Sequence, residues 1–296
     1  MTAQATDRVK TAQRLLGSSS KNSYDPFLDI DWDAPLPEGV AYLPLERVSL
    51  YGTPLWEQLT PEQRVELSKH EIASIASTGL WFEIILMQML IREAYHRSPH
   101  DAGTQYALTE VGDETRHVIM FAKAIERLGC PRYRPPWFVH HLARLYKATA
   151  RGPAMYAPVL VAEEVTDRLQ RLTMQDETIH PLIRMVNRIH VVEEARHVRY
   201  ARGEVARVLP QLSPPRRAWH NLIAAIVSSV IVSVLIDPKV YAAVGLDPKE
   251  ARRVARRNPH HQETVRWMGE KIMTFLDEQG MVTRTTRRIY RAAHLL

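Results

Sequence analysis

One motif occurs twice in this chain, and its repetition constrains the fold more than any other sequence feature. Each copy places a glutamate three residues before a histidine, within the pattern acidic-Glu-x-Arg-His-Val. The copies are DETRHV at 113–118 and EEARHV at 193–198, so Glu194 repeats Glu114 and His197 repeats His117. Helical side chains three residues apart share one face, with Cβ atoms about 5 to 6 Å apart, so each pair can hold one metal ion. The repeat predicts two equivalent helices with matching metal-binding faces.

The chain around these motifs predicts helices and shows no long strand-like alternation. Thr60, Pro61 and Gln63 have the pattern of a capping box with a first-turn proline, so a long helix should begin there. Gly152, Pro153 and Pro158 should break or kink the chain before a later helix. The expected helices cover 61–95, 101–128, 137–150, a segment ending near 177, 181–208 and 217–236, followed by shorter ones.

The predicted fold class is all-α, with a four-helix bundle at its core. A chain of 296 residues can form one large core, so we expect a single domain. Within it, residues 1–59 should form an extended arm because prolines and aromatics dominate 22–60 without a helical period. Residues 60–210 should form the metal-binding helix core, and 211–296 the C-terminal helices.

Two further glutamates keep the spacing of the repeat. Glu83 precedes Glu114 by the same interval that separates Glu163 from Glu194. A four-helix di-metal site needs one glutamate from each of two partner helices, which these residues supply. Glu83 also lies in an apolar run, where an unpaired charge is costly to bury. The alternative for Glu83 is a salt bridge with an arginine such as Arg92.

The ligand types indicate the metal. Four carboxylates and two imidazoles favour iron, with manganese as the alternative, over structural zinc. Cys130 is the single cysteine, so the sequence offers no thiolate cage. Glu71 and Glu164 are rival carboxylates, ranked second because neither keeps the repeat spacing.

The two copies differ one turn before the shared glutamate. His190 stands four residues before Glu194, whereas its counterpart in the first copy is Glu110. Spacing alone leaves His190 open between a third nitrogen ligand and a core histidine that hydrogen-bonds to a ligand.

The acidic residue that begins each motif also has two interpretations. Asp113 and Glu193 could orient the histidines or pair with Arg116 and Arg196. The salt bridges are the expected outcome, because helix geometry turns both arginines away from the metals.

At these motifs the chain resembles the AurF-type di-iron oxygenases, a family that includes p-aminobenzoate N-oxygenase. The resemblance covers about residues 60–210 and implies a ferritin-like core with a histidine beyond the usual six ligands. Matched to the family motif, the seven implied metal ligands are Glu83, Glu114, His117, Glu163, His190, Glu194 and His197.

The resemblance implies an oxygenase that uses two iron ions and O2 to oxidise an amine or aromatic substrate, most simply by N-oxygenation of an arylamine in antibiotic biosynthesis. Related proteins with the same ligands hydroxylate carbon instead, and fold does not decide between these outcomes. The other classes considered are a ferritin-like iron-binding protein without oxygenase activity and a helical bundle without metal.

The pocket for such a substrate should be lined by residues one turn from the ligands. These are Ala76, Gly79, Met87, Tyr156 and Val159. Ala76 and Gly79 leave room where their repeat counterparts, Tyr156 and Val159, fill space.

The remaining sequence features limit which partners and which cellular location we expect. No Gly-rich dinucleotide fingerprint is present, so electrons should come from a separate reductase, a ferredoxin or a chemical donor. The net charge of +6 includes arginine clusters without nucleic-acid motifs, so no nucleic acid is expected. The apolar run 222–235 is shorter than a bilayer span of about 20 residues and predicts a buried helix or a homodimer contact, with no membrane segment. No secretory signal is apparent, so we expect a cytoplasmic protein.

Overall fold

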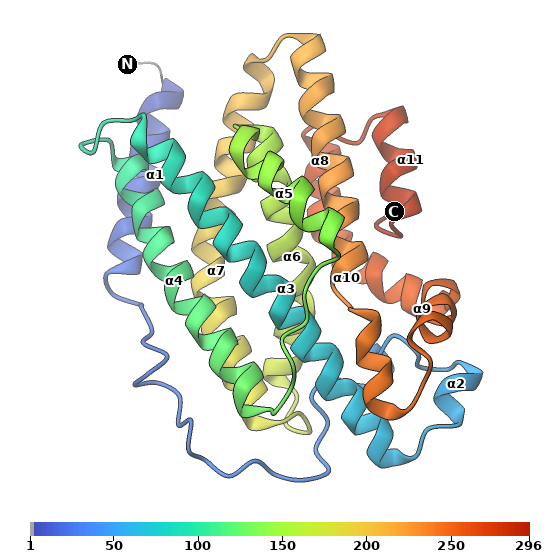
Figure 1. Cartoon of the computed structure of the whole chain (residues 1–296). Helices are drawn as coiled ribbons and strands as arrows, with labels where there is room; N and C mark the ends of the chain where they lie inside the picture. The colour runs from blue at the N-terminus through green and yellow to red at the C-terminus, as the bar shows by residue number, and fades with distance from the viewer. Residues whose placement is uncertain (1–2) are drawn as a thin grey trace.

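Four long helices form the centre of the protein in the computed structural model, which describes residues 3–296. They are α3 (Pro61–Tyr95), α4 (Ala102–Arg127), α6 (Pro153–Gln175) and α7 (Pro181–Val208). Helix α3 packs on α4 and α6 packs on α7, while α4 also contacts α7 and joins the two pairs (Figure 1). Across residues 3–296 the chain forms helices, turns and one isolated bridge between Ala41 and Ile179, with no strand. The all-α prediction is confirmed.

The ends of the core helices follow from local sequence. Thr60 Oγ1 accepts a hydrogen bond from the Gln63 backbone N–H at 3.3 Å, and Gln63 Oε1 accepts one from the Thr60 N–H at 2.9 Å. This reciprocal pair is the capping box that the sequence predicts, and it satisfies two N–H groups that the helix leaves free. Asp101 caps α4 in a related way by accepting from the Thr104 N–H at 3.1 Å.

Helix α6 begins earlier than the sequence predicts. It starts at Pro153 and runs through Pro158, which we expected to break or kink the chain. Proline has no N–H to donate to the carbonyl four residues before it, which here is that of Ala154. The Tyr146 hydroxyl donates to the carbonyls of Ala154 and Met155, at 3.1 and 3.2 Å, and replaces the missing donor. A side chain from another helix therefore lets α6 continue.

The N-terminal arm is also only partly extended. Residues Ala3–Ser19 form helix α1, which packs on α4 and α7, so the prediction of an extended arm over 1–59 is wrong for this segment. Arg8 pairs with Glu204 at 2.8 Å and Asp101 at 3.1 Å, while Ala12 and Leu15 are buried. Residues beyond α1 do run as an irregular strap, interrupted by the short helices η1 (Leu45–Arg47) and α2 (Pro54–Glu57).

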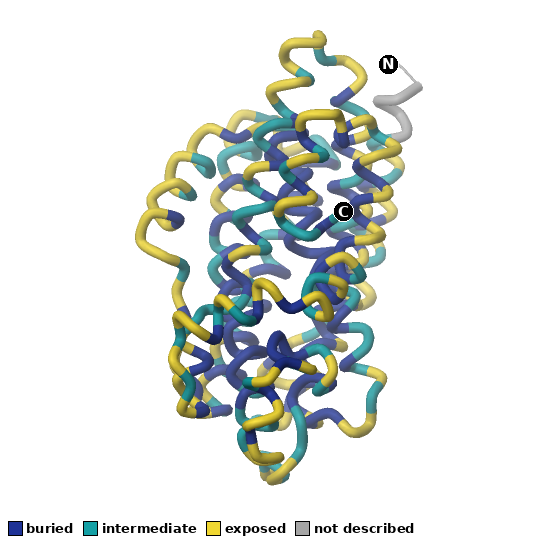
Figure 2. The backbone as a smooth tube through the Cα atoms, turned by 90° about the vertical axis from the view of Figure 1, so that its right-hand side faces the viewer, coloured by how far each residue is buried: buried dark blue, intermediate teal, exposed yellow. Residues whose placement is uncertain are grey.

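The remaining helices cover the core from outside. Helices α8 (Pro214–Val234) and α10 (Pro259–Glu278) pack on α6, and α11 (Arg284–Ala292) packs on α8. Helix α5 (Trp137–Thr149) lies over α3, and η2 (Leu209–Gln211), η3 (Pro238–Val244) and α9 (Pro248–Arg257) complete the chain. Buried residues gather in the interior of the bundle, and exposed residues lie mainly on its outside and at its ends (Figure 2).

Two helical segments have the length and apolar composition of a membrane span. They are Pro61–Tyr95, in which 61% of the most apolar 18-residue stretch is buried, and Pro214–Val244, in which 33% is buried. The first carries the predicted metal ligand Glu83 in the core, and the second packs on α6 and α11, an arrangement consistent with a soluble protein. Exposed Trp219 and Ile226 leave α8 partly uncovered. The homodimer through this helix and the cytoplasmic location stay predictions.

Candidate metal centre

The structure brings all seven sequence-predicted ligand side chains into one buried region between the four core helices. Helix α3 contributes Glu83, α4 contributes Glu114 and His117, α6 contributes Glu163, and α7 contributes His190, Glu194 and His197. None of the seven is more than 6% exposed. Faces built from residues three, four and seven apart on each helix explain the convergence, because such residues point to one side of the helix.

The two Glu-x-x-His motifs interlock across the α4 and α7 contact. His117 Nδ1 lies 2.9 Å from Glu114 Oε2 and 3.6 Å from Glu194 Oε1. His197 Nδ1 lies 2.8 Å from Glu194 Oε1 and 3.1 Å from Glu114 Oε1. Each histidine therefore faces the glutamates of both repeats, as a pair of ions shared between the repeats requires.

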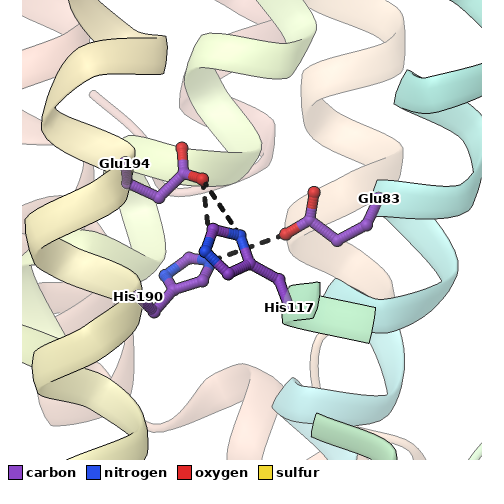
Figure 3. A group of neighbouring side chains, drawn as sticks. All are labelled: Glu83, His117, His190 and Glu194. Carbon is purple, nitrogen blue, oxygen red and sulfur yellow. Dashed lines mark hydrogen bonds and ion pairs between the residues drawn. The ribbon is translucent and has the colours of Figure 1, made fainter. Parts of the chain in front are cut away.

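The ligand atoms fall into two groups, in each of which they lie within 4.8 Å of one another. The first group is Glu83, His117, His190 and Glu194, whose side chains point toward a common centre (Figure 3). The second is Glu110, Glu114 and His197. Glu163 approaches the first group, with its Oε2 4.0 Å from His190 Nε2. Two adjacent metal positions fit this division.

His190 is held in the orientation of a metal ligand. Its Nδ1 lies 2.9 Å from the Gln170 side-chain oxygen, which accepts the ring N–H and leaves the lone pair on Nε2. That Nε2 faces Glu83 at 3.4 Å and Glu194 at 3.9 Å. Burial, with His117 beside it, holds the pKa of His190 well below its usual range. A neutral imidazole with its lone pair toward two carboxylates suits a metal ion between them.

The charges of the cluster are also compatible with a bound cation. Burial raises the pKa values of Glu83 and Glu163 well above their usual range, and neighbouring carboxylates raise them further. Burial alone would raise the pKa of Glu114 too, but the His197 and His117 imidazoles hold it well below its usual range. Among the described residues, Glu83 Oε2 and Glu194 Oε2 have no hydrogen-bond partner. Buried, unpartnered carboxylate oxygens are costly unless a proton or metal satisfies them, so these residues fit a divalent metal pair.

Asp113 and Glu193 orient the histidines of the opposite repeat. Asp113 Oδ2 lies 3.1 Å from His197 Nε2, and Glu193 Oε2 lies 2.9 Å from His117 Nε2. Accepting an N–H at Nε2 directs the Nδ1 lone pair toward the metal position and raises its basicity. The predicted arginine contacts exist as well, since Arg116 pairs with Asp113 and Arg196 lies 3.5 Å from Glu193. The expected salt bridges are therefore confirmed, and the alternative role also occurs, but toward the histidine of the opposite repeat, because these contacts cross between helices and do not follow from spacing within one helix.

The rival carboxylates lie elsewhere. Glu71 accepts hydrogen bonds from the Ser49 backbone N–H and hydroxyl, and burial raises its pKa to about 7. Glu164 pairs with Arg202 at 2.7 Å. Gln170 and Glu110 are the side chains that sequence reasoning did not assign to the site, although the repeat already paired Glu110 with His190.

An apolar cavity of about 50 Å³ adjoins the first group of side chains. Glu83, Glu163 and His190 are among its lining residues, and Ala76 and Gly79 line it as the sequence predicted. Met87, Tyr156 and Val159, which we also expected there, are not among the lining residues. The rest of the lining is mainly aliphatic or aromatic, including Ile72, Phe82, Phe121, Leu169 and Ile183. A site of this kind shields a reacting centre from bulk water.

The four-helix core and its buried carboxylates and imidazoles define a class of helical protein whose interior is compatible with a di-iron site. The chain belongs to the AurF family, because the family model described as P-aminobenzoate N-oxygenase AurF matches residues 5–280. Membership supports an oxygenase of the di-iron type and confirms the predicted family.

Curated relatives of the chain carry no assigned activity in their names. Uncharacterized protein Rv0885 of Mycobacterium tuberculosis is 26% identical over 260 residues, covering 85% of this chain and 76% of its own length. Uncharacterized protein Mb0909 of Mycobacterium bovis matches with the same identity and coverage. These relatives extend the similarity beyond the motifs to most of the chain.

Proposed function

We propose that this protein is an O2-dependent di-iron monooxygenase that oxidises a small arylamine at nitrogen. The observation that carries the proposal is the buried cluster of four carboxylates and three imidazoles beside an apolar cavity. The family match supports iron and oxygenase chemistry, with manganese as the alternative metal. The choice of an arylamine rests on the activity after which the family is named, p-aminobenzoate N-oxygenase.

The proposed ligands are the seven side chains of the cluster, Glu83, Glu114, His117, Glu163, His190, Glu194 and His197. Two bound ferrous ions would supply the redox chemistry that activates dioxygen. Burial keeps His190 neutral, the Gln170 hydrogen bond fixes its tautomer, and Glu193 and Asp113 fix His117 and His197. These contacts set ligand direction before any metal arrives.

The balanced reaction defines what else is needed. An arylamine, dioxygen, two electrons and two protons give an arylhydroxylamine and water, with one oxygen atom entering the nitrogen–hydrogen bond. No dinucleotide fingerprint is present, so we propose that a separate reductase or ferredoxin delivers the electrons.

Access to the cavity runs through an outer groove. A groove of about 540 Å³ lies between α3, α5 and α8, and it shares Phe82 and Ile231 with the lining of the inner cavity. An empty cavity that binds benzene measures about 150 Å³, so an aromatic ring does not fit the inner space of about 50 Å³ without movement. Phe82 and Ile231 separate the two spaces, and their displacement would admit the ring while keeping bulk water out.

The test is product analysis under 18O2. Iron-loaded protein with a chemical reductant is mixed with aromatic amines and with matched phenols that lack the amine, and products are identified by mass spectrometry. Labelled hydroxylamine or nitro products from amines alone support the proposal. Labelled carbon-hydroxylated products indicate a hydroxylase, and iron uptake far above two ions per chain without any product indicates storage.

A further inference from the structure

Glu110 is a buried carboxylate that the seven-residue ligand set leaves unexplained. It lies on α4, one turn before Glu114, and only 2% of its surface is exposed. In the described part of the chain, its Oε2 has no hydrogen-bond partner. A buried carboxylate oxygen left in this state costs free energy comparable to a lost charged hydrogen bond, so a native protein satisfies it with a proton or a cation.

The polar groups near Glu110 have other partners, including His197, whose Nδ1 lies 2.8 Å from Glu194 and whose Nε2 lies 3.1 Å from Asp113. The Tyr200 hydroxyl donates to the Gly103 carbonyl at 3.2 Å, and the Tyr156 hydroxyl donates to Glu93 at 3.0 Å. Arg196 is held by the Asn22 carbonyl at 2.9 Å and by the motif carboxylates. The Tyr106 hydroxyl, one turn before Glu110, is itself buried without a partner among residues 3–296.

The repeat gives Glu110 a position in the cluster equivalent to that of His190. Glu110 lies with Glu114 and His197 in one group, and its counterpart His190 lies with Glu194 and His117 in the other. Each residue therefore stands beside the glutamate of its own helix and the histidine of the opposite helix. Gln170, which supports His190, corresponds in the repeat to Leu90, which has no polar side chain to hold Glu110.

We infer that Glu110 is an eighth protein ligand, bound to the metal at His197 as His190 is bound to the metal at His117. The inference rests on the metal pair of the proposed function. It makes the two ions chemically different, because one gains a neutral nitrogen ligand and the other an anionic oxygen ligand. The harder oxygen donor favours the more oxidised iron at the His197 position.

The experiment is an anaerobic titration of the metal-free protein with 57Fe2+, followed by Mössbauer spectroscopy. Wild type should bind two ions per chain and give two distinct quadrupole doublets. In Glu110→Gln, one equivalent should bind at least about 10-fold more weakly, since even partners that only orient ligands contribute 10- to 100-fold. Only one of the two doublets should change.

Two further variants separate a ligand from a merely structural residue. Glu71→Gln removes another buried carboxylate with a raised pKa, away from the cluster, and should leave both equivalents and both doublets unchanged. Glu110→His should restore tight binding of the second ion and make the doublets more alike, because both metals then carry the extra imidazole.

Folding is checked by the melting temperature without metal. Glu110→Gln should melt at or above the wild-type temperature in the metal-free state, because the amide needs no counterion, and below it once iron is bound. Two tight equivalents with unaltered doublets in Glu110→Gln would overturn the inference alone. Fewer than two ions in wild type would overturn the proposed function together with the inference.

Discussion

The site has two halves, one around His190 and the other around Glu110. Both come from one repeated pattern, but the side chains that surround them differ. Beside His190 the structure leaves an apolar cavity, lined by Ala76 and Val186. The repeat counterparts of these two residues are Tyr156 and Tyr106, and both are buried. Tyr200, which stands where the first half has Met120, packs against both of these tyrosines. One half is therefore open to a small molecule, while the other is filled with aromatic rings.

This difference separates the role of the ligand side chains from the role of the side chains around them. In the proposed metal centre, the shared glutamates and histidines would hold one metal ion in each half, and the residues one turn away would decide which half meets a substrate. A duplicated site keeps its ligands and diverges in the neighbouring side chains, because those can change size without losing the metal. The experiments that follow break the equivalence of the halves or sharpen their difference.

The largest effect is expected from removing one motif histidine at a time. His117→Ala and His197→Ala should each lower the iron content from two ions per chain to one or fewer, and oxygenase turnover should fall at least about 100-fold, beyond the range for orienting partners. Metal analysis by inductively coupled plasma mass spectrometry checks this. Two tightly bound ions in either variant would show that this half does not depend on its histidine.

The pH dependence of stability should distinguish Glu71, outside both halves, from the cluster. Burial raises the pKa of Glu71 to about 7, above the ordinary value of 4.5, so the folded state binds the proton more tightly than the unfolded state. Its contribution is full below pH 4.5 and is lost as the pH rises through 7, a change of roughly 3 kcal/mol. Urea unfolding at pH 5 and pH 8 should show a loss in Glu71→Gln that is smaller than the wild-type loss by about this amount, because the cluster carboxyls, whose pKa values are also raised, titrate in both proteins. The same loss in both proteins would assign it to another group.

The crossed carboxylates test whether the halves support their histidines equally. Asp113→Asn and Glu193→Gln should each weaken iron binding by about 10- to 100-fold, because the ligand histidine loses the carboxylate that orients it. Competition with a chelator measures the affinities. A loss in one variant only would mean that the two crossed contacts are not equivalent in solution, and Glu164→Gln, at an equally buried carboxylate outside the cluster, serves as the control.

Filling the cavity beside His190 with a larger side chain should lower product formation without changing the iron content. Ala76→Tyr introduces the side chain of the counterpart Tyr156 into the cavity, at a cost in stability of about 1 to 3 kcal/mol for overpacking. Product formation should fall about 10-fold or more while two iron ions stay bound, as seen by metal analysis. Gly79→Val is the milder partner, because an added Cβ would meet Phe121 at 3.9 Å, an ordinary contact. Unchanged turnover in Ala76→Tyr would place the substrate elsewhere.

Much of the site could be predicted from spacing along the sequence. The constant interval of the repeat selected Glu83 and Glu163 from the available carboxylates, and the structure places both with the motif residues, while Glu71 and Glu164 lie apart. The crossing of Asp113 to His197 could not be predicted in this way. This contact depends on the crossing angle between α4 and α7, which cannot be derived from the spacing of residues along the sequence.

The amino-acid sequence alone determined most of the long core helices, their caps and the faces on which the acidic and imidazole side chains lie, because these follow from periodicity and local hydrogen bonding, and the repeated motifs indicated the family. Contacts between helices decided the rest: the continuation of α6 through Pro158 by the Tyr146 hydroxyl, the docking of α1 through Arg8, and the position of the cavity beside His190. The physical reason is the distance along the chain over which each interaction acts. A helix fixes neighbours three and four residues apart, whereas an empty space or a replaced hydrogen bond exists only once distant segments are packed together.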